Sequence, residues 1–145
     1  MKASLYVGMI VAVVLPAMAS PFIGAEQCKS CHPAEYTQWK TSAHGKATSR
    51  LSREQRRDPR CTSCHATSAA EGLFGVQCES CHGAGGHYWP EAVMRDPVLA
   101  RAAGLKRGSE PATCLRCHTV DSSRLRPFNM AEALKLIRHS GAKSE

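Results

Sequence analysis

The pattern of apolar and polar positions predicts few regular elements, and the clearest is a helix over residues 129–140. Its apolar positions recur every three to four residues, at Met130, Ala133, Leu134 and Ile137, so they share one helical face. Asn129 suits the N-cap, Glu132 completes a capping box, and Gly141 follows as a stop signal. This segment is therefore expected to fold as an amphipathic helix.

The rest of the pattern predicts short helices joined by loops, with almost no sheet. Pro33 suits a first helical position, and residues 34–51 are predicted to continue as a helix. Residues 53–60 are strongly charged, which is typical of a solvated loop. Residues 90–105 predict a helix interrupted at Pro97.

The N-terminal segment has the pattern of a secretory signal peptide. Lys2 precedes an apolar run over residues 5–15, and an A-x-A site ends at Ala19. The alternative is a membrane anchor, but the run is shorter than the roughly 20 residues that span a bilayer. We therefore expect cleavage after Ala19, export to a bacterial periplasm without stable membrane insertion, and one mature domain over residues 20–145.

All eight cysteines belong to four copies of one motif, C-x-x-C-H, which is the attachment site of a c-type haem. The predicted thioether-forming cysteines are Cys28, Cys31, Cys61, Cys64, Cys78, Cys81, Cys114 and Cys117. The predicted proximal iron ligands are His32, His65, His82 and His118. The motifs therefore predict four covalently bound haem c groups.

Eight cysteines in C-x-x-C pairs have two other possible uses. Four C-x-x-C pairs could form two four-cysteine zinc sites, or the cysteines could pair as disulfides. Neither use explains why histidine follows the second cysteine in all four copies. The chain has only seven histidines in 145 residues, so this repetition is not expected by chance. Covalent haem attachment is the interpretation that accounts for every position of the motif.

The predicted number of haems bears on how the length and the charge of the chain are interpreted. A mature chain of 126 residues has about 31 residues per haem, too few to bury four porphyrins and build a separate apolar core. We therefore expect a small, mostly α fold with extensive loops, in which stacked haems form the core. The net charge of +7 either steers docking to acidic redox partners or offsets haem propionates. The expected export and the lack of a dense run of basic residues argue against nucleic acid as a binding partner.

The histidine count limits the second axial ligands. Beyond the four proximal histidines the chain has three, His44, His87 and His139, and each is predicted to ligate a haem iron. Three spare histidines cannot serve four irons, so at least one haem has methionine, water or an open position instead. Met94 and Met130 are the methionines available in the mature chain.

Several segments resemble the tetrahaem cytochrome c-554 family. The first motif continues as C-x-x-C-H-P and is followed by Tyr36, Trp39, Ser42 and His44. The third motif lies in G-V-Q-C-E-S-C-H-G over residues 75–83, and the second continues with Ala66 and Thr67. The resemblance covers roughly residues 26–120.

The resemblance implies a pairing of the axial ligands. Carried over from the family, the pairs are His82 with His44, His32 with His87, and His118 with His139. The second haem, at His65, would then be five-coordinate, in agreement with the histidine count.

The expected function is electron transfer. Irons with two histidine ligands change geometry little on reduction, so such haems suit a periplasmic carrier that shuttles electrons between respiratory redox partners, its donor and its acceptor. The alternative is a haem enzyme that reduces nitric oxide, nitrite, hydroxylamine or peroxide at the five-coordinate haem, with Arg57, Arg60 and Glu71 near the second motif. A gas or redox sensor is a third hypothesis, but a sensor normally needs an output domain, and the haem motifs leave no residues for one.

Overall fold

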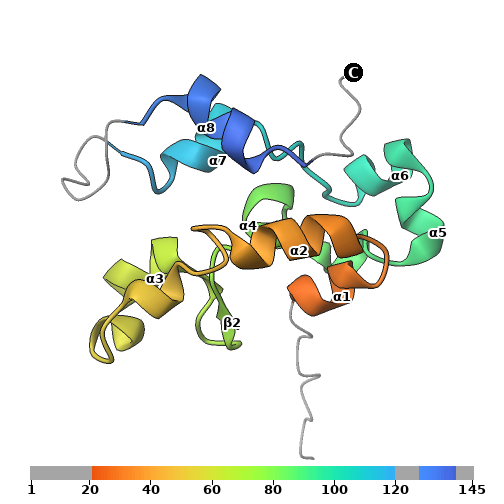
Figure 1. Cartoon of the computed structure of the whole chain (residues 1–145). Coiled ribbons are helices and arrows are strands. Elements are labelled where there is room, and N and C mark those ends of the chain that lie inside the picture. The colour runs from red at the N-terminus through yellow and green to blue at the C-terminus, as the bar shows by residue number, and fades with distance from the viewer. Residues whose placement is uncertain (1–20, 120–127, 140–145) are drawn as a thin grey trace, which may run out of the picture.

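Figure 1 shows the computed structural model, which describes residues 21–119 and 128–139. The expected signal peptide, residues 1–19, lies outside the described residues, and so does the expected helix stop at Gly141. Within the described part of the chain, none of the helices is long and apolar enough to cross a membrane.

The described residues form short helices and one small sheet, as the sequence predicts. The α-helices are α1 (Ala25–Lys29), α2 (Pro33–Thr41), α3 (Pro59–His65), α4 (Cys78–His82), α5 (Glu91–Met94), α6 (Pro97–Ala102), α7 (Pro111–Leu115) and α8 (Met130–Ile137). Three 3₁₀ turns are η1 (Thr48–Arg50), η2 (Gln55–Arg57) and η3 (Gly85–His87). Strand β1 (Ala66–Ser68) pairs antiparallel with β2 (Leu73–Phe74). The mostly α fold class is therefore confirmed.

Local signals explain where many of these helices begin. Proline occupies the start of α2, α3, α6 and α7, where its missing N–H costs nothing. The side chains of Asp58, Asp96 and Asn129 accept N–H bonds as N-caps of α3, α6 and α8. The predicted C-terminal helix is thus confirmed over Met130–Ile137, with the predicted cap.

Two predicted elements differ from the structure. The helix expected over residues 34–51 ends at Thr41, because the chain folds back so that a Cβ on Gly45 would lie 2.4 Å from the Trp39 carbonyl oxygen. Residues 53–60, expected to be loop, instead contain η2 and the start of α3. There the N-cap at Asp58 and the proline after it outweigh the charged composition.

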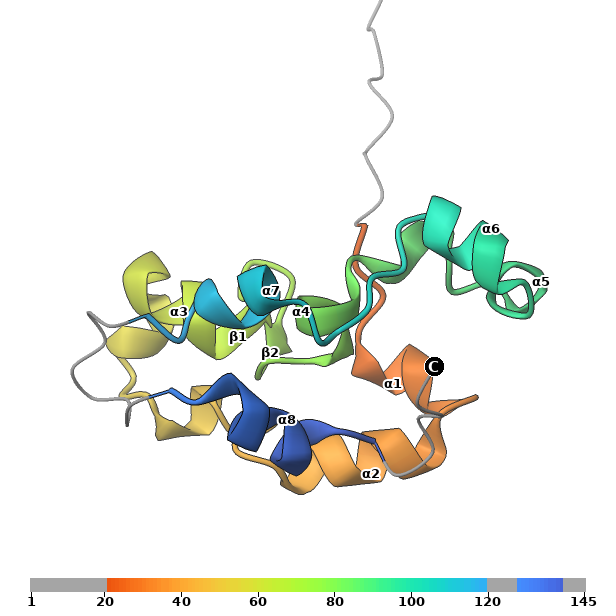
Figure 2. The same ribbon diagram turned by 90° about the horizontal axis from the view of Figure 1, so that it is seen from above.

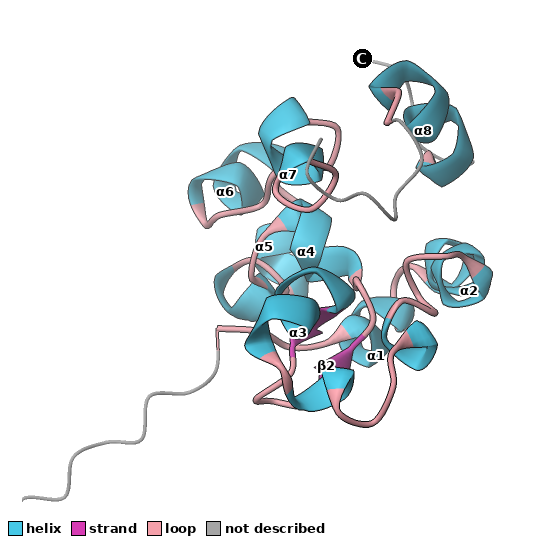
Figure 3. Cartoon of the chain, turned by 90° about the vertical axis from the view of Figure 1, so that its left-hand side faces the viewer, coloured by secondary structure: helices cyan, strands magenta, loops and turns pink. Residues whose placement is uncertain are grey.

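The helices lie in separated groups connected by loops. Figures 1 and 3 show α7 and α8 on one side, α1, α2 and α3 on the other, and α4 between them. Helix α1 packs against α2 and α4, and α4 packs against α7. Seen from above, α8 runs over α2 (Figure 2), and Gln38 Nε2 of α2 donates to the Arg138 carbonyl at 3.1 Å.

The described polypeptide has almost no apolar core of its own. Its buried apolar residues are mostly small: Ala25, Tyr36, Ala47, Ala66, Tyr88 and Ala100. No large side chain in the described residues is fully buried, whereas Leu136 is 80% exposed. A chain that leaves such side chains uncovered needs another apolar body to pack against, which agrees with the expectation that prosthetic groups supply the core.

Candidate haem-binding site

Each C-x-x-C-H motif folds as a helical turn. The second and third motifs lie within α3 and α4. In the first and fourth, the histidine N–H donates to the carbonyl of the first cysteine, at 2.9 Å for His32 and 3.0 Å for His118. Positions i, i+3 and i+4 share one helical face, so both thiols and the imidazole of each motif point to the same side. None of the eight cysteines forms a disulfide.

Backbone carbonyls orient two of the proximal imidazoles. Nδ1 of His65 lies 2.9 Å from the Ala47 carbonyl oxygen, and Nδ1 of His82 lies 3.1 Å from the Lys106 carbonyl oxygen. With Nδ1–H donating to a carbonyl, the lone pair is on Nε2, the nitrogen left free for a metal. These carbonyls are functional groups that sequence reasoning missed, because any residue type supplies one.

Two pairs of histidine rings face each other at the spacing of a shared metal. The ring centres of His44 and His118 are 6.0 Å apart, and those of His82 and His139 are 6.3 Å apart. A metal–imidazole bond is about 2 Å long and the ring centre lies about 1 Å beyond the nitrogen, so two imidazoles on opposite sides of one metal have centres about 6 Å apart. Both pairs have the ring spacing of a bis-imidazole iron, with angles of 59° and 28° between the ring planes.

The distal members of these pairs are held in the form that ligates metals. Burial lowers the pKa of His44, and the charge of His118 lowers it further. Burial is also the main cause of the lowered pKa of His139, followed by the charge of His82. A lowered pKa favours the neutral imidazole, the form that binds a metal. In addition, the buried Nδ1 atom of His139 has no hydrogen-bond partner among the described residues.

The observed pairs exchange partners relative to those that the family resemblance implies. The resemblance places His44 opposite His82 and His139 opposite His118, whereas the structure places His44 beside His118 and His139 beside His82. Helix α8 decides this exchange, because its C-terminal end places His139 against α4.

The third implied pair is not brought together in the same way. His32 and His87 are both exposed, and none of the ring contacts between described residues joins them. His87 lies at the end of η3. Its ligation of the first haem therefore stays a prediction.

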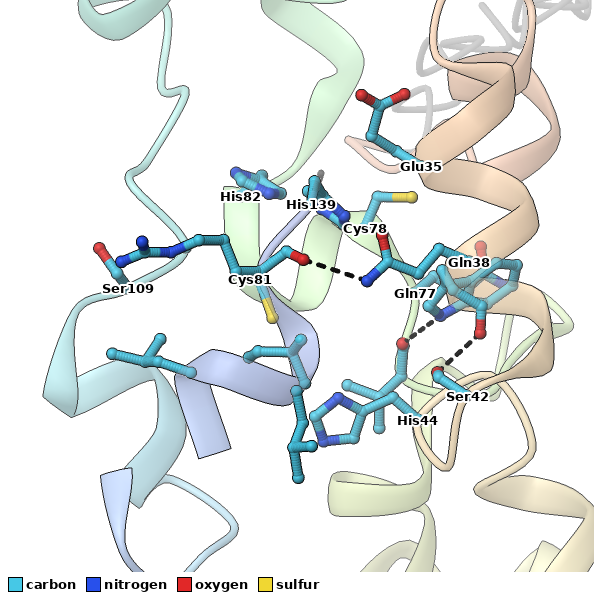
Figure 4. Close-up of a pocket in the computed structure, with 17 residues that line it drawn as sticks. Glu35, Gln38, Ser42, His44, Gln77, Cys78, Cys81, His82, Ser109 and His139 are labelled. Atoms are coloured by element: carbon cyan, nitrogen blue, oxygen red, sulfur yellow. Dashed lines mark hydrogen bonds between the residues drawn. The ribbon is translucent and has the colours of Figure 1, made fainter. Parts of the chain in front are cut away.

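A cavity of about 520 Å³ adjoins the third motif (Figure 4). Figure 4 shows His82 and His139 close together beside Cys78 and Cys81, with His44 farther along the same cavity. Apolar side chains of α2 and α8 form part of the lining: Trp39, Leu134, Leu136 and Ile137. Two thiols and the neighbouring imidazoles of His82 and His139 in one apolar cavity match the donor set of a covalently attached haem.

The position of Gly108 beside this cavity explains why that residue has no side chain. A Cβ at Gly108 would lie 3.1 Å from Cε1 and 3.3 Å from Nε2 of His82. The absence of a side chain thus keeps the metal-binding edge of His82 clear. No sequence pattern around residue 108 indicated this role.

Thiols of different motifs come close to one another. Cys28 and Cys78 lie within hydrogen-bond distance, and this bond lowers the pKa of Cys28 and raises that of Cys78. Burial, followed by a hydrogen bond with Cys64, raises the pKa of Cys117 to about 11. The first motif therefore adjoins the third, and the second adjoins the fourth.

The zinc alternative finds no support in this arrangement. A four-cysteine zinc site needs converging ligands, and no three His, Cys, Asp or Glu side chains of the described residues form such a group.

The second motif has a different environment from the third and fourth. No ring contact between described residues places a second histidine beside His65. Arg57 and Glu71 are exposed, and Arg60 is engaged by Asp58 at 2.7 Å, which lowers the pKa of that carboxyl. The suggested proton donors near the second haem are thus on the surface or already paired.

Helical C-x-x-C-H turns, oriented proximal imidazoles and an apolar cavity between facing histidines define a c-type cytochrome, which binds haem c covalently. Residues 27–83 match the family described as cytochrome c554 and c-prime, which confirms the resemblance to the cytochrome c-554 family.

A curated relative carries the same name. The chain is similar to cytochrome c-554 of Nitrosomonas europaea (strain ATCC 19718 / CIP 103999 / KCTC 2705 / NBRC 14298), at 30% identity over 96 residues. The alignment covers 48% of this chain and 41% of the relative, so the chain matches about two fifths of that protein's length. No solved structure matches the chain.

Proposed function

We propose that the protein is a periplasmic tetrahaem electron carrier that shuttles electrons between respiratory redox partners. The observation that carries the proposal is the pair of facing imidazoles at each of two motifs, 6.0 and 6.3 Å apart. Four motifs support four haems, and the signal-like pattern over residues 1–19 supports the periplasm. A membrane quinol dehydrogenase or another oxidoreductase would be the donor, and a terminal reductase or oxidase the acceptor.

The side chains at the two histidine pairs suit electron transfer rather than a reaction on a bound substrate. Haem supplies the one-electron chemistry when bound. His82 with His139 would hold the haem at the third motif and His118 with His44 the haem at the fourth, and these side chains would keep water and substrate away from the iron. The Lys106 carbonyl holds the His82 ring, and Phe128 stacks on His118 with ring centres 4.4 Å apart, so contacts within the chain position both rings.

Contacts between motifs support passage of electrons through the molecule. Cys28 lies against Cys78 and Cys64 against Cys117, so the porphyrins attached there would have neighbouring edges. Docking to donor and acceptor is expected to be transient and to use a small interface.

Mass spectrometry with quantified electron paramagnetic resonance tests this function. The purified, air-oxidised protein should begin at Ser20, carry four haems, and show three low-spin haems beside one high-spin haem. The carrier must also be reduced and reoxidised by partner extracts without consuming a small substrate. Fewer than four haems, or a chain retained in the cytoplasm, would contradict the proposal.

One observation favours a second function, reduction of a small ligand at the second haem. No second histidine ring contacts His65 among the described residues, although His44 and His139 are both engaged elsewhere. The test is carbon monoxide binding to the reduced protein. One molecule per four haems supports an open site, and then nitric oxide, nitrite, hydroxylamine and peroxide should be assayed. No binding removes this function and leaves a carrier alone.

A further inference from the structure

The segment over residues 44–48, which follows helix α2 and enters turn η1, holds the proximal histidine of the second motif. The Ala47 carbonyl oxygen lies 2.9 Å from Nδ1 of His65 and accepts the ring proton. The next residue, Thr48, donates its hydroxyl proton to the backbone carbonyl of His65. Two consecutive residues of this segment therefore bind both the ring and the main chain of one predicted iron ligand.

Thr48 is buried and has a second backbone partner. Its exposed fraction is 7%, and its hydroxyl oxygen accepts from the Gly75 N–H at 2.7 Å. One hydroxyl thus donates to the end of α3 and accepts from the residue that follows β2. Removing it would take a hydrogen bond from two backbone groups at once, and such a loss is costly where the groups are buried.

The residues around Gly75 allow this close contact. Gly75 has a φ of +80°, and a Cβ there would lie 2.8 Å from the Gly45 carbonyl oxygen, so a larger residue could not approach in the same way. The next residue, Val76, donates its N–H to the His44 carbonyl at 3.0 Å. The 44–48 segment is therefore fixed at both of its ends to the residues between β2 and α4.

The same segment supplies a distal histidine. His44 begins the segment, and its ring centre lies 6.0 Å from that of His118, in the fourth motif. The His44 carbonyl also accepts from the Ala47 N–H at 3.1 Å, which closes the segment into one turn. Because this turn contains both His44 and the contacts to His65, displacing Thr48 should disturb two haem sites.

We propose that Thr48 is a positioning residue that fixes His65 for the second haem and holds His44 in place opposite His118 for the fourth. A ring N–H bonded to a carbonyl makes the other ring nitrogen a more basic ligand, and a more basic ligand favours the oxidised iron. Loosening the 44–48 segment should therefore raise the reduction potential of the second haem. This inference rests on the proposed function, because it requires haem at both motifs.

Thr48→Val tests the hydroxyl, because valine keeps nearly the same shape. The matched control is Thr62→Val, within the second motif itself. Thr62 is similarly buried, at 9% exposure, but its hydroxyl donates to the Asp58 carbonyl at 3.2 Å and not to the His65 carbonyl. Thr48→Ser, which keeps the hydroxyl, is the rescue variant.

An NMR-monitored redox titration, with each haem assigned by its thioether contacts, gives the readout. Thr48→Val should shift the haem on Cys61 and Cys64 about threefold toward reduction, equal to about 28 mV for one electron. It should also displace the resonances of the haem on Cys114 and Cys117, which His44 is expected to ligate. Thr48→Ser and Thr62→Val should leave both haems as they are in the unmodified protein.

Each result supports or overturns the proposal. Four haems with unchanged potentials in Thr48→Val would overturn it while leaving the carrier function intact, and so would an equal shift in Thr62→Val. A change confined to the second haem would overturn the link to His44. Fewer than four haems in the unmodified protein contradicts the proposed function itself.

A second measurement applies if Thr48→Val retains fewer haems. Hydrogen exchange of the unmodified protein then tests the contacts of Thr48 directly. The Gly75 amide and the ring N–H of His65 should both be protected from exchange. Exchange of either at the rate of an exposed group would overturn the proposal.

Discussion

The loss of His139 should convert one haem from low-spin to high-spin. His139 follows α8, and its ring centre lies 6.3 Å from that of His82, so it is expected to be the sixth ligand of the third haem. In His139→Ala that iron keeps His82 alone, and the high-spin fraction of the oxidised protein should rise by about one quarter of the total haem iron.

The structure also indicates how much stability this substitution costs. Nδ1 of His139 is buried without a partner among the described residues, so truncation leaves no new unsatisfied group there. We expect a loss of roughly 1–3 kcal/mol from lost packing and ligation, with all four haems still attached. Added imidazole should enter the space left in the 520 Å³ cavity and restore the low-spin signal.

Quantified electron paramagnetic resonance with and without imidazole is the assay, and Arg138→Ala is the matched control. Arg138 is exposed and uses its backbone carbonyl to accept from Gln38, so its side chain can be removed without touching the ligand set. An unchanged high-spin fraction in His139→Ala would refute the reasoning. So would NMR assignment of the altered haem to Cys114 and Cys117, since the partner of His139 would then be His118.

Three further predictions follow from the same contacts. His44→Ala should produce a high-spin haem at the fourth motif, assigned by the same NMR contacts; a change at the third motif would contradict the 6.0 Å pair with His118. Gly108→Ala should destabilise the protein by about 1–3 kcal/mol in thermal unfolding and perturb the third haem's spectrum, because its Cβ would lie 3.1 Å from the His82 ring; the exposed neighbouring substitution Ser109→Ala should do neither. Asn129→Ala should lower the free energy of unfolding by about 0.5–2 kcal/mol and weaken the spectral signature of the His82–His139 pair, since Asn129 caps α8 at the Glu132 N–H. An unchanged melting temperature would show that the cap is dispensable.

The features that the sequence predicts well are those encoded by residues close together in the chain. Asn129 caps α8 through an amide three residues away, and the C-x-x-C-H spacing places thiols and imidazole on one helical face. Such features depend on backbone geometry within one or two helical turns, so a sequence pattern is sufficient to find them.

The features that the sequence misses depend on contacts between distant segments. The helix expected over residues 34–51 ends at Thr41, because the chain turns back so that Gly45 lies against the Trp39 carbonyl. Glu79 looks like any polar residue inside a motif until Gly24, 55 residues away, donates to it.

By itself, the sequence predicted the chemistry of this protein: covalent haem sites, proximal histidines, and too few histidines to fill every axial position of four haems. Only the tertiary structure decided which distal histidine faces which motif, with His44 beside His118 and His139 beside His82. The physical reason is that a ligand's identity is a property of one side chain, whereas its partner depends on where a whole helix such as α8 packs. That position is set by contacts across the fold, which no local pattern in the chain records.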